Sequence, residues 1–292
     1  METLESLSDT LETTGDIQSI VRTMKALSSV SIRQYERAEA AIADYARTVE
    51  LGLMAILRQR RLEGAPLPVA DAGTGREGLI VIGSDRGLCG GYNDRIIRFA
   101  RSRMEDEPML LSVIGARVAA RLEADGRRVD GFHSLPGSVE GISRLARAVI
   151  VEIDRWTRLE RVGRVQLVHN RREGQNAAKP QALRLLPLSD SHLRTLSAAD
   201  WPGRSAPLFR MDPDRLMSWL IQQRLFVMIY RALAEALACE HASRLAAMRA
   251  AERNIEERRD DLCQFYRLRR QETITRELLD VVSGYEAVRS GE

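Results

Sequence analysis

The last quarter of the sequence constrains the fold most, because it predicts one helix longer than an ordinary domain. Residues 212–284 contain one proline, Pro213, and no glycine before Gly284. Asp212 is expected to cap the first turn, and Pro213 follows it where a missing N–H costs nothing. Such a helix would be roughly 100 Å long, so we expect it to pair with another helix, to lie inside another protein, or both. Its apolar residues recur at steps of three and four: Leu216, Leu220, Val227, Tyr230, Leu233, Leu237, Leu245, Met248, Ile255 and Leu262.

A second long helix is predicted at the other end of the chain, over residues 4–62. In its first half the apolar face comprises Leu4, Leu7, Leu11, Ile17, Ile20, Val21, Met24 and Leu27. After Ser28 the face continues through Ser31, Ala38, Ala41, Tyr45, Val49 and Leu53. Two terminal helices with matching faces predict an antiparallel coiled coil. Polar residues interrupt the second face at Gln222, Gln223, Glu240 and His241, which indicates that a third surface contacts the helix there.

Between the helices the pattern changes to alternating strands and helices. Residues 79–82 form a short apolar run, typical of a buried parallel strand. Further strands are predicted at 109–114, 165–169 and 182–188, and helices at 94–105, 116–124 and 138–158, the last with Ser138 as its cap. This alternation predicts an inserted, Rossmann-like α/β domain with a mainly parallel sheet. The predicted division is therefore helix 1–62, linker 63–77, α/β domain 78–190, linker 191–211 and helix 212–292.

Charge and hydropathy argue against nucleic acid and membrane insertion. The 44 Lys and Arg nearly balance the 41 Asp and Glu, for a net charge of +3. The arginines of residues 253–276 are interleaved with acidic residues, which cancels most of the field that a nucleic acid would need. No run approaches eighteen apolar residues, so no membrane-spanning helix is expected. The polar, acidic start of the sequence shows no targeting signal.

No arrangement of residues predicts catalysis, a cofactor or a metal. The four histidines are scattered, with no nucleophile beside them: His133, His169, His192 and His241. The three cysteines, Cys89, Cys239 and Cys263, lack metal-ligand spacing. Cys239 and Cys263 are too far apart on one helix to bridge each other. These features predict a reduced protein on the cytosolic side.

The sequence SDRGLCGGYN, residues 84–93, lies between a predicted strand and a predicted helix. It matches neither GxGxxG nor GxxxxGK[ST], so a phosphate-binding loop is disfavoured. We interpret it as a tight glycine-rich turn that lets the backbone approach a neighbour. A redox-sensitive thiol at Cys89 is the alternative interpretation.

The same turn resembles the signature of the γ subunit of F-type ATP synthases. Four other segments resemble that family in order and spacing: residues 17–27, 185–188, 240–251 and 270–278. The sequence departs from the family at Gly15-Asp16 and at Tyr285-Glu286. These departures leave open a divergent version from a second operon, such as a sodium-translocating one.

The resemblance implies a central rotor shaft that couples ion flow to ATP synthesis or hydrolysis and is itself non-catalytic. Its implied partners are a hexamer of α and β subunits, the ε subunit and the membrane c-ring, at the cytoplasmic face of the bacterial inner membrane. The predicted coupling residues are Arg22, Met24, Lys25, Glu240, Arg244, Arg270 and Glu277, and the predicted stalk-base turn contains Arg86, Gly87, Gly90 and Gly91. A nucleotide-binding α/β enzyme with helical extensions and a generic coiled-coil adaptor are the alternatives.

Overall fold

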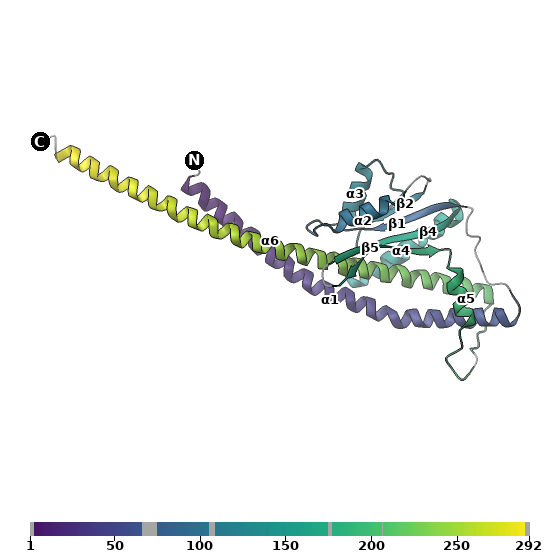
Figure 1. Cartoon of the computed structure of the whole chain (residues 1–292). Coiled ribbons are helices and arrows are strands. Elements are labelled where there is room, and N and C mark those ends of the chain that lie inside the picture. The colour runs from purple at the N-terminus through teal and green to yellow at the C-terminus, as the bar shows by residue number, and fades with distance from the viewer. Residues whose placement is uncertain (1–2, 66–74, 105–108, 175–176, 206, 290–292) are drawn as a thin grey trace. The chain divides into compact units, whose positions relative to one another are not determined.

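The computed structural model describes residues 3–65, 75–104, 109–174, 177–205 and 207–289. The chain divides into two compact units. We call Ser28–Arg244 the body, and Met1–Leu27 with Leu245–Glu292 the helix pair. Two long helices, α1 (Leu4–Leu62) and α6 (Pro213–Arg289), contribute to both units (Figure 1). The two predicted terminal helices are thus confirmed.

Local hydrogen bonds cap the C-terminus of α1 and the N-terminus of α6. At the end of α1, Gly64 has a φ of +70°. Its amide donates to the carbonyl of Arg61, and the Ala65 amide donates to the carbonyl of Arg60, the pairing of a Schellman motif. At the start of α6, a carboxylate oxygen of Asp212 accepts the amide of Arg215 at 2.9 Å, so the predicted N-cap is confirmed.

The body contains one sheet of five strands in the order β3-β2-β1-β4-β5. The strands are β1 (Arg76–Ile82), β2 (Leu110–Ile114), β3 (Gly131–His133), β4 (Val162–Glu173) and β5 (Ala177–Leu186). The first four pair in parallel, and β5 returns antiparallel along β4. The predicted mainly parallel α/β domain is confirmed.

Helices cover both faces of this sheet (Figure 1). Alternate residues of β1 point to opposite faces. Leu79 and Val81 pack with α2 (Tyr92–Arg101) and α3 (Ala116–Ala124). Ile80 and Ile82 belong to a second core that includes α4 (Val139–Leu159) and the first part of α6. The body is therefore a three-layer domain in which α6 supplies part of the core.

The segment Ala232–Glu240 of α6 is buried on every side of the helix. The sequence predicted that a second helix or another protein would cover this helix, and it did not identify a segment that the body encloses. The alanines at 232, 234, 236 and 238 allow close approach, because a helix with small residues all round can pack against several neighbours at once. Leu233 and Leu237 fill the core between α1 and the sheet.

Within the body, α1 presents a slightly different face from the predicted one. Tyr35, Ala38, Val49 and Leu53 are buried, whereas Ala41 and Tyr45 are exposed. Gly52 of α1 lies where Leu220 of α6 approaches. A Cβ added at Gly52 would lie 2.7 Å from a methyl group of Leu220. The absence of a side chain at this position therefore sets how closely the two helices pack there.

The two segments of the helix pair run antiparallel. The side chain of Arg259 donates to Gln18 at 3.0 Å, and that of Lys25 donates to Glu252 at 2.5 Å. A step forward from 18 to 25 on α1 thus matches an equal step back from 259 to 252 on α6. Leu7, Val21 and Met248 are buried between the helices. Three predicted seam residues are instead exposed: Ile17, Ile20 and Leu27.

Several elements of the body differ from the sequence prediction. Strand β3 and helix α5 (Asp190–Ala198) were not predicted. Each is short and buries at most two apolar side chains, so neither shows a clear apolar spacing in the sequence. Strand β1 begins at Arg76, inside the predicted linker. Strands β4 and β5 extend beyond their apolar runs, since ladder pairing continues where the side chains are polar. Ser138 precedes α4 but makes no side-chain cap hydrogen bond.

Candidate functional site

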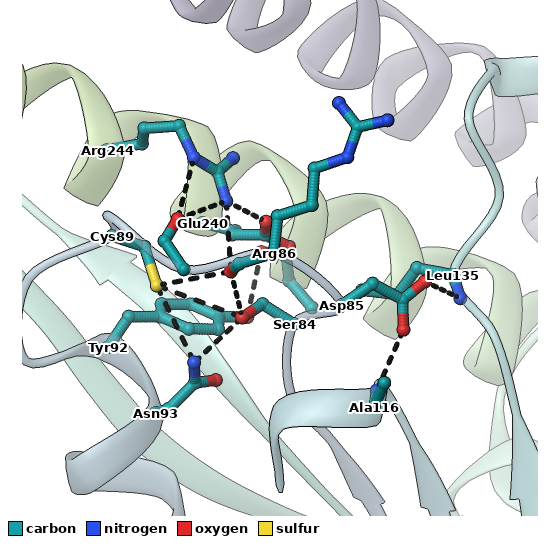
Figure 2. A network of polar contacts seen from close by, with 12 residues as sticks. Ser84, Asp85, Arg86, Cys89, Tyr92, Asn93, Ala116, Leu135, Glu240 and Arg244 are labelled. Atoms are coloured by element: carbon teal, nitrogen blue, oxygen red, sulfur yellow. Dashed lines mark hydrogen bonds and ion pairs between the residues drawn. The ribbon is translucent and has the colours of Figure 1, made fainter.

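The turn of residues 84–93 is fixed by its own polar side chains (Figure 2). The Ser84 hydroxyl donates to the backbone carbonyl of Arg86 at 2.8 Å. It also accepts a hydrogen bond from the side-chain amide of Asn93 at 2.8 Å. Leu88 and Gly90 have φ values of +60° and +57°, which only glycine adopts at little cost. The predicted tight turn is present, and at Leu88 it carries backbone strain.

Asp85 joins this turn to two other segments of the body (Figure 2). One oxygen of its carboxylate accepts the amide of Ala116, the first residue of α3, and the other accepts the amide of Leu135, both at 2.8 Å. A carboxylate at a helix N-terminus interacts favourably with the free amides and the helix dipole. Asp85 therefore occupies the position at α3 that a bound phosphate would take, which agrees with the absence of a phosphate-loop motif.

The other side of the turn rests on α6 through Arg244. This guanidinium pairs with Glu240 at 2.5 Å and donates to the carbonyls of Arg86 and Gly87 at 3.4 and 3.3 Å. Both charged side chains are more than nine-tenths buried. Burial raises the pKa of the Glu240 carboxyl, although Arg244 opposes that shift. We call Glu240, Arg244 and the two turn carbonyls the clasp.

Tyr92 adds a second connection between the turn and α6. Its hydroxyl donates to the backbone carbonyl of Ala236 at 3.1 Å. The backbone carbonyl of Tyr92 accepts a hydrogen bond from the side-chain amide of Asn170 at 3.0 Å. Tyr92 is fully buried, and desolvation raises its pKa well above the ordinary value. The phenol therefore stays neutral and available as a donor. The third surface predicted at Glu240 is this turn of the same chain, whereas His241 lies against α1.

His241, one residue beyond Glu240, stacks on Tyr35 of α1 with 5.6 Å between ring centroids. Burial, together with the charges of Arg244 and Arg86, lowers the pKa of His241 to about 4. The ordinary value is 6.5. A neutral imidazole is therefore part of the packing between α1 and α6, and protonating it would place a third positive charge beside two arginines.

We expect the body to lose stability on acidification because of His241. A lowered pKa gives a stabilising contribution that is complete above pH 6.5 and is lost as the pH falls towards 4. The shift corresponds to about 3 kcal/mol. His241→Gln should remove this part of the pH dependence, measured as the free energy of unfolding in urea at several pH values. Equal slopes in the variant and the unsubstituted chain would contradict the assignment.

The structure brings some of the predicted coupling residues together and leaves others apart. Arg22 and Lys25 both lie against Glu252, at 3.7 and 2.5 Å. The Lys25 hydrogen bond, followed by the Lys25 and Arg22 charges, lowers the pKa of Glu252. Met24 is partly buried. Arg270 and Glu277 are exposed, on the part of α6 that belongs to the helix pair.

The predicted stalk-base turn lies against two of the predicted coupling residues, Glu240 and Arg244. Arg86 and Gly87 offer their carbonyls to Arg244, while the Arg86 side chain, Gly90 and Gly91 are exposed. Asp85, Tyr92, Asn170 and Glu252 also make contacts at these places and were not predicted from the sequence. The position of Asp85, three residues after the end of a strand, was a usable signal, whereas the other three residues contact partners far apart in sequence.

Two cysteines lie in the same small cluster with Tyr92 and Ala178. All three cysteines of the chain are free thiols, and Cys89 and Cys239 are buried. Burial raises the pKa of both thiols, that of Cys239 to about 12. Both are therefore protonated at neutral pH, and this disfavours Cys89 as a reactive thiol. In the described ranges, no group of His, Cys, Asp and Glu is arranged to hold a metal ion.

None of the helices in the described ranges has an apolar stretch long enough to span a bilayer.

Comparison with known proteins agrees with this architecture. The ATP synthase family profile matches residues 3–288. The ATP synthase gamma chain of Synechococcus sp. (strain PCC 6716) is 28% identical across 99% of this chain and 100% of its own length. That of Granulibacter bethesdensis is 29% identical with the same coverage.

Solved structures share the fold. A chain of the Euglena gracilis mitochondrial ATP synthase OSCP/F1/c-ring assembly superposes with a TM-score of 0.67 at 18% identity, covering 99% of this chain and 95% of that one. A chain of the rotor of the same enzyme gives 0.63 at 17% identity, covering 93% and 98%. The chain belongs to the gamma chain family of ATP synthases, and a gamma chain is a subunit of that complex.

Proposed function

We propose that this chain is the central rotor shaft of an F-type ATP synthase and breaks no bonds itself. In this proposal the helix pair occupies the axis of a hexamer of α and β subunits, and the body joins the ε subunit and the membrane c-ring. Rotation would couple ion flow through the ring to ATP synthesis or hydrolysis. The chain would act as a peripheral subunit at the cytoplasmic face of the bacterial inner membrane.

The observation that carries this proposal is the continuity of α6. One unbroken helix, Pro213–Arg289, supplies the buried segment Ala232–Glu240 of the body and then continues as one of the two helices of the helix pair. Because that segment is enclosed on all sides and clasped by the turn, a torque applied to the body cannot be lost by slippage of the helix. A helix also resists twisting better when it is paired than when it is alone.

The surface of the helix pair supports a surrounding partner. Large apolar side chains of α6 are exposed there: Phe265, Leu268, Ile274, Leu278, Leu279, Val281 and Val282. Exposed apolar side chains concentrated along one element indicate a protein contact. Arginine and apolar residues together are typical of such contacts. We propose Arg22, Met24, Lys25, Arg270 and Glu277 as residues that couple this surface to the β subunit.

The clasp suggests a different role for the other two predicted coupling residues. Since Glu240 and Arg244 are buried against the turn, we propose that they couple indirectly, by holding the exposed side chains of Arg86 and Leu88 in a fixed position. The partner would then contact the turn and not the buried pair.

Co-expression with the α and β subunits of the same genome tests the rotor proposal. We expect a stable complex that contains one copy of this chain per three αβ pairs, measured by native mass spectrometry. The control is co-expression of α and β without this chain, which shows whether the hexamer forms by itself. Absence of the chain from purified complexes, or a ratio of one copy per αβ pair, would refute the proposal.

A further inference from the structure

Four arginines follow one another along the exposed face of α4, whose other face packs into the core of the body through buried apolar side chains. They are Arg144, Arg147, Arg155 and Arg158, and all four are exposed. With Val151 between the second and the third, neighbours in this row are three or four positions apart, so they share one side of the helix. We call the four residues the arginine ridge. It is about 21 Å long at helical rise.

The acidic residue best placed in sequence to neutralise the ridge is turned away from it. Glu152 precedes Arg155 by three positions, but its carboxylate faces the sheet. There it accepts the Ser112 hydroxyl at 3.0 Å and lies 2.8 Å from Nε2 of His133. Gly131 of β3 leaves room for it, because a Cβ at that position would overlap the carboxylate. The glutamate therefore holds β2, β3 and α4 together and leaves the ridge uncompensated at this point.

The other acidic residues near the ridge are engaged as well. Asp154 pairs with Arg158 at 2.9 Å, and Glu160 pairs with Arg76 of β1 at 3.4 Å. Glu140 lies in the first turn of α4, where the helix dipole balances a carboxylate. Within the described ranges the other three arginines of the ridge form no ion pair. A positive surface thus remains on a face that the fold of the body does not use.

The centre of the ridge is small and apolar. Ala148 and Val151 are exposed there, and Leu159 follows at the end of the helix with 74% of its surface exposed. An apolar centre bordered by arginines is the composition of a protein contact. Residues 144–158 are all described by the structure, and their exposed face has no aromatic side chain, since Trp156 is buried. Base stacking and anchoring at a membrane interface both rely on aromatic side chains, so a protein partner is favoured.

Arginine and its spacing define the chemistry of that partner. A guanidinium can hold a carboxylate with two parallel hydrogen bonds, which gives the pairing a fixed geometry. Cations three and four positions apart on a straight helix match carboxylates of the same spacing on a second helix. Because Ala148 and Val151 are small, the axis of a second helix can come close to that of α4.

We propose that the arginine ridge docks an acidic α-helix of a partner protein. The carboxylates of this helix recur at steps of three and four and pair with Arg144, Arg147 and Arg155, while small apolar residues between them pack on Val151. The proposal does not depend on the rotor role, because it concerns a face of α4 that can be tested on the chain alone.

Fluorescence anisotropy with the purified full chain and two labelled peptides of about 18 residues tests this surface. The first is an alanine-rich helix with glutamates at steps of three and four along one side. The second has the same composition, with the glutamates distributed around the helix. We expect one-to-one binding of the first peptide, about tenfold tighter than that of the second and weakened by salt. Equal affinities would show attraction of any acidic chain and would refute a docked helix.

Variants of exposed residues assign the binding to the ridge. The double variant Arg147→Gln with Arg155→Gln should weaken binding of the first peptide about tenfold. Val151→Glu should do the same, because the new carboxylate lies four positions from both arginines and occupies them. Arg194→Gln, at an exposed position of α5, is the matched control and should leave binding unchanged.

Two further measurements complete the test. An unchanged urea midpoint for each variant shows that the body still folds. Anionic lipid vesicles and a DNA duplex are titrated with the same chain, and binding to either one as tight as that of the first peptide would assign the ridge to lipid or nucleic acid. That outcome, no binding of the first peptide, or binding that the ridge variants do not weaken would overturn the proposal.

Discussion

Replacing Arg244 with methionine is expected to lower the free energy of unfolding of the body by about 3–5 kcal/mol, because Glu240 is left as a buried, unpaired carboxylate. The turn also loses the donors to its carbonyls at Arg86 and Gly87. Urea unfolding followed by tryptophan fluorescence measures this loss selectively, since all three tryptophans, at 156, 201 and 219, belong to the body.

The double substitution Arg244→Met with Glu240→Gln is the matched control. It removes the unpaired charge, so it should recover about 1–3 kcal/mol of the loss. The pKa of Glu240 is already raised, and stability from its protonated form is lost as the pH rises through that raised value. The defect of the single variant should therefore shrink as the pH falls towards 4.5. If the loss in free energy of unfolding changes neither with pH nor with the second substitution, the buried charge is not its cause.

Leu233→Ala is expected to cost about 2–5 kcal/mol, the range for a large-to-small change in a core that cannot collapse. Leu233 is fully buried between α1 and the sheet, in the segment of α6 that is enclosed on all sides. The same urea titration gives the value.

Leu278→Ala provides the comparison on the same helix. Leu278 is 61% exposed, so its truncation should change the free energy of unfolding by no more than about 0.5 kcal/mol. Equal costs at the two leucines would mean that α6 is not a core element of the body. A small cost at 278 together with weaker assembly with α and β would support a contact surface there.

The outline of the fold could be predicted from sequence because its signals are local. Unbroken three- and four-residue spacing marked both long helices, and the apolar run at 79–82 marked the central strand. The resemblance carried by residues 84–93 pointed to the family. The N-cap at Asp212 was also predictable, because its side chain accepts the backbone amide only three residues further on.

The remaining features depend on contacts between distant residues, and no local pattern encodes them. Glu240 looked like a flaw in an apolar face, because its partner Arg244 is held by the carbonyls of a turn more than a hundred and fifty residues earlier. The exposure of Ile17 and Ile20 could not be predicted, since spacing alone does not show which of two adjacent apolar stripes meets the partner helix.

The antiparallel pairing of the first and last segments has a consequence for biosynthesis. Met1–Leu27 leaves the ribosome before Ser28–Arg244, but its partner, Leu245–Glu292, is made after all of Ser28–Arg244. The body can fold while Met1–Leu27 still lacks a partner, and Leu7 and Val21 stay open to solvent until residues 245–292 have been made. The helix pair is therefore completed after the body, and its apolar residues are the ones that a chaperone would meet on the growing chain.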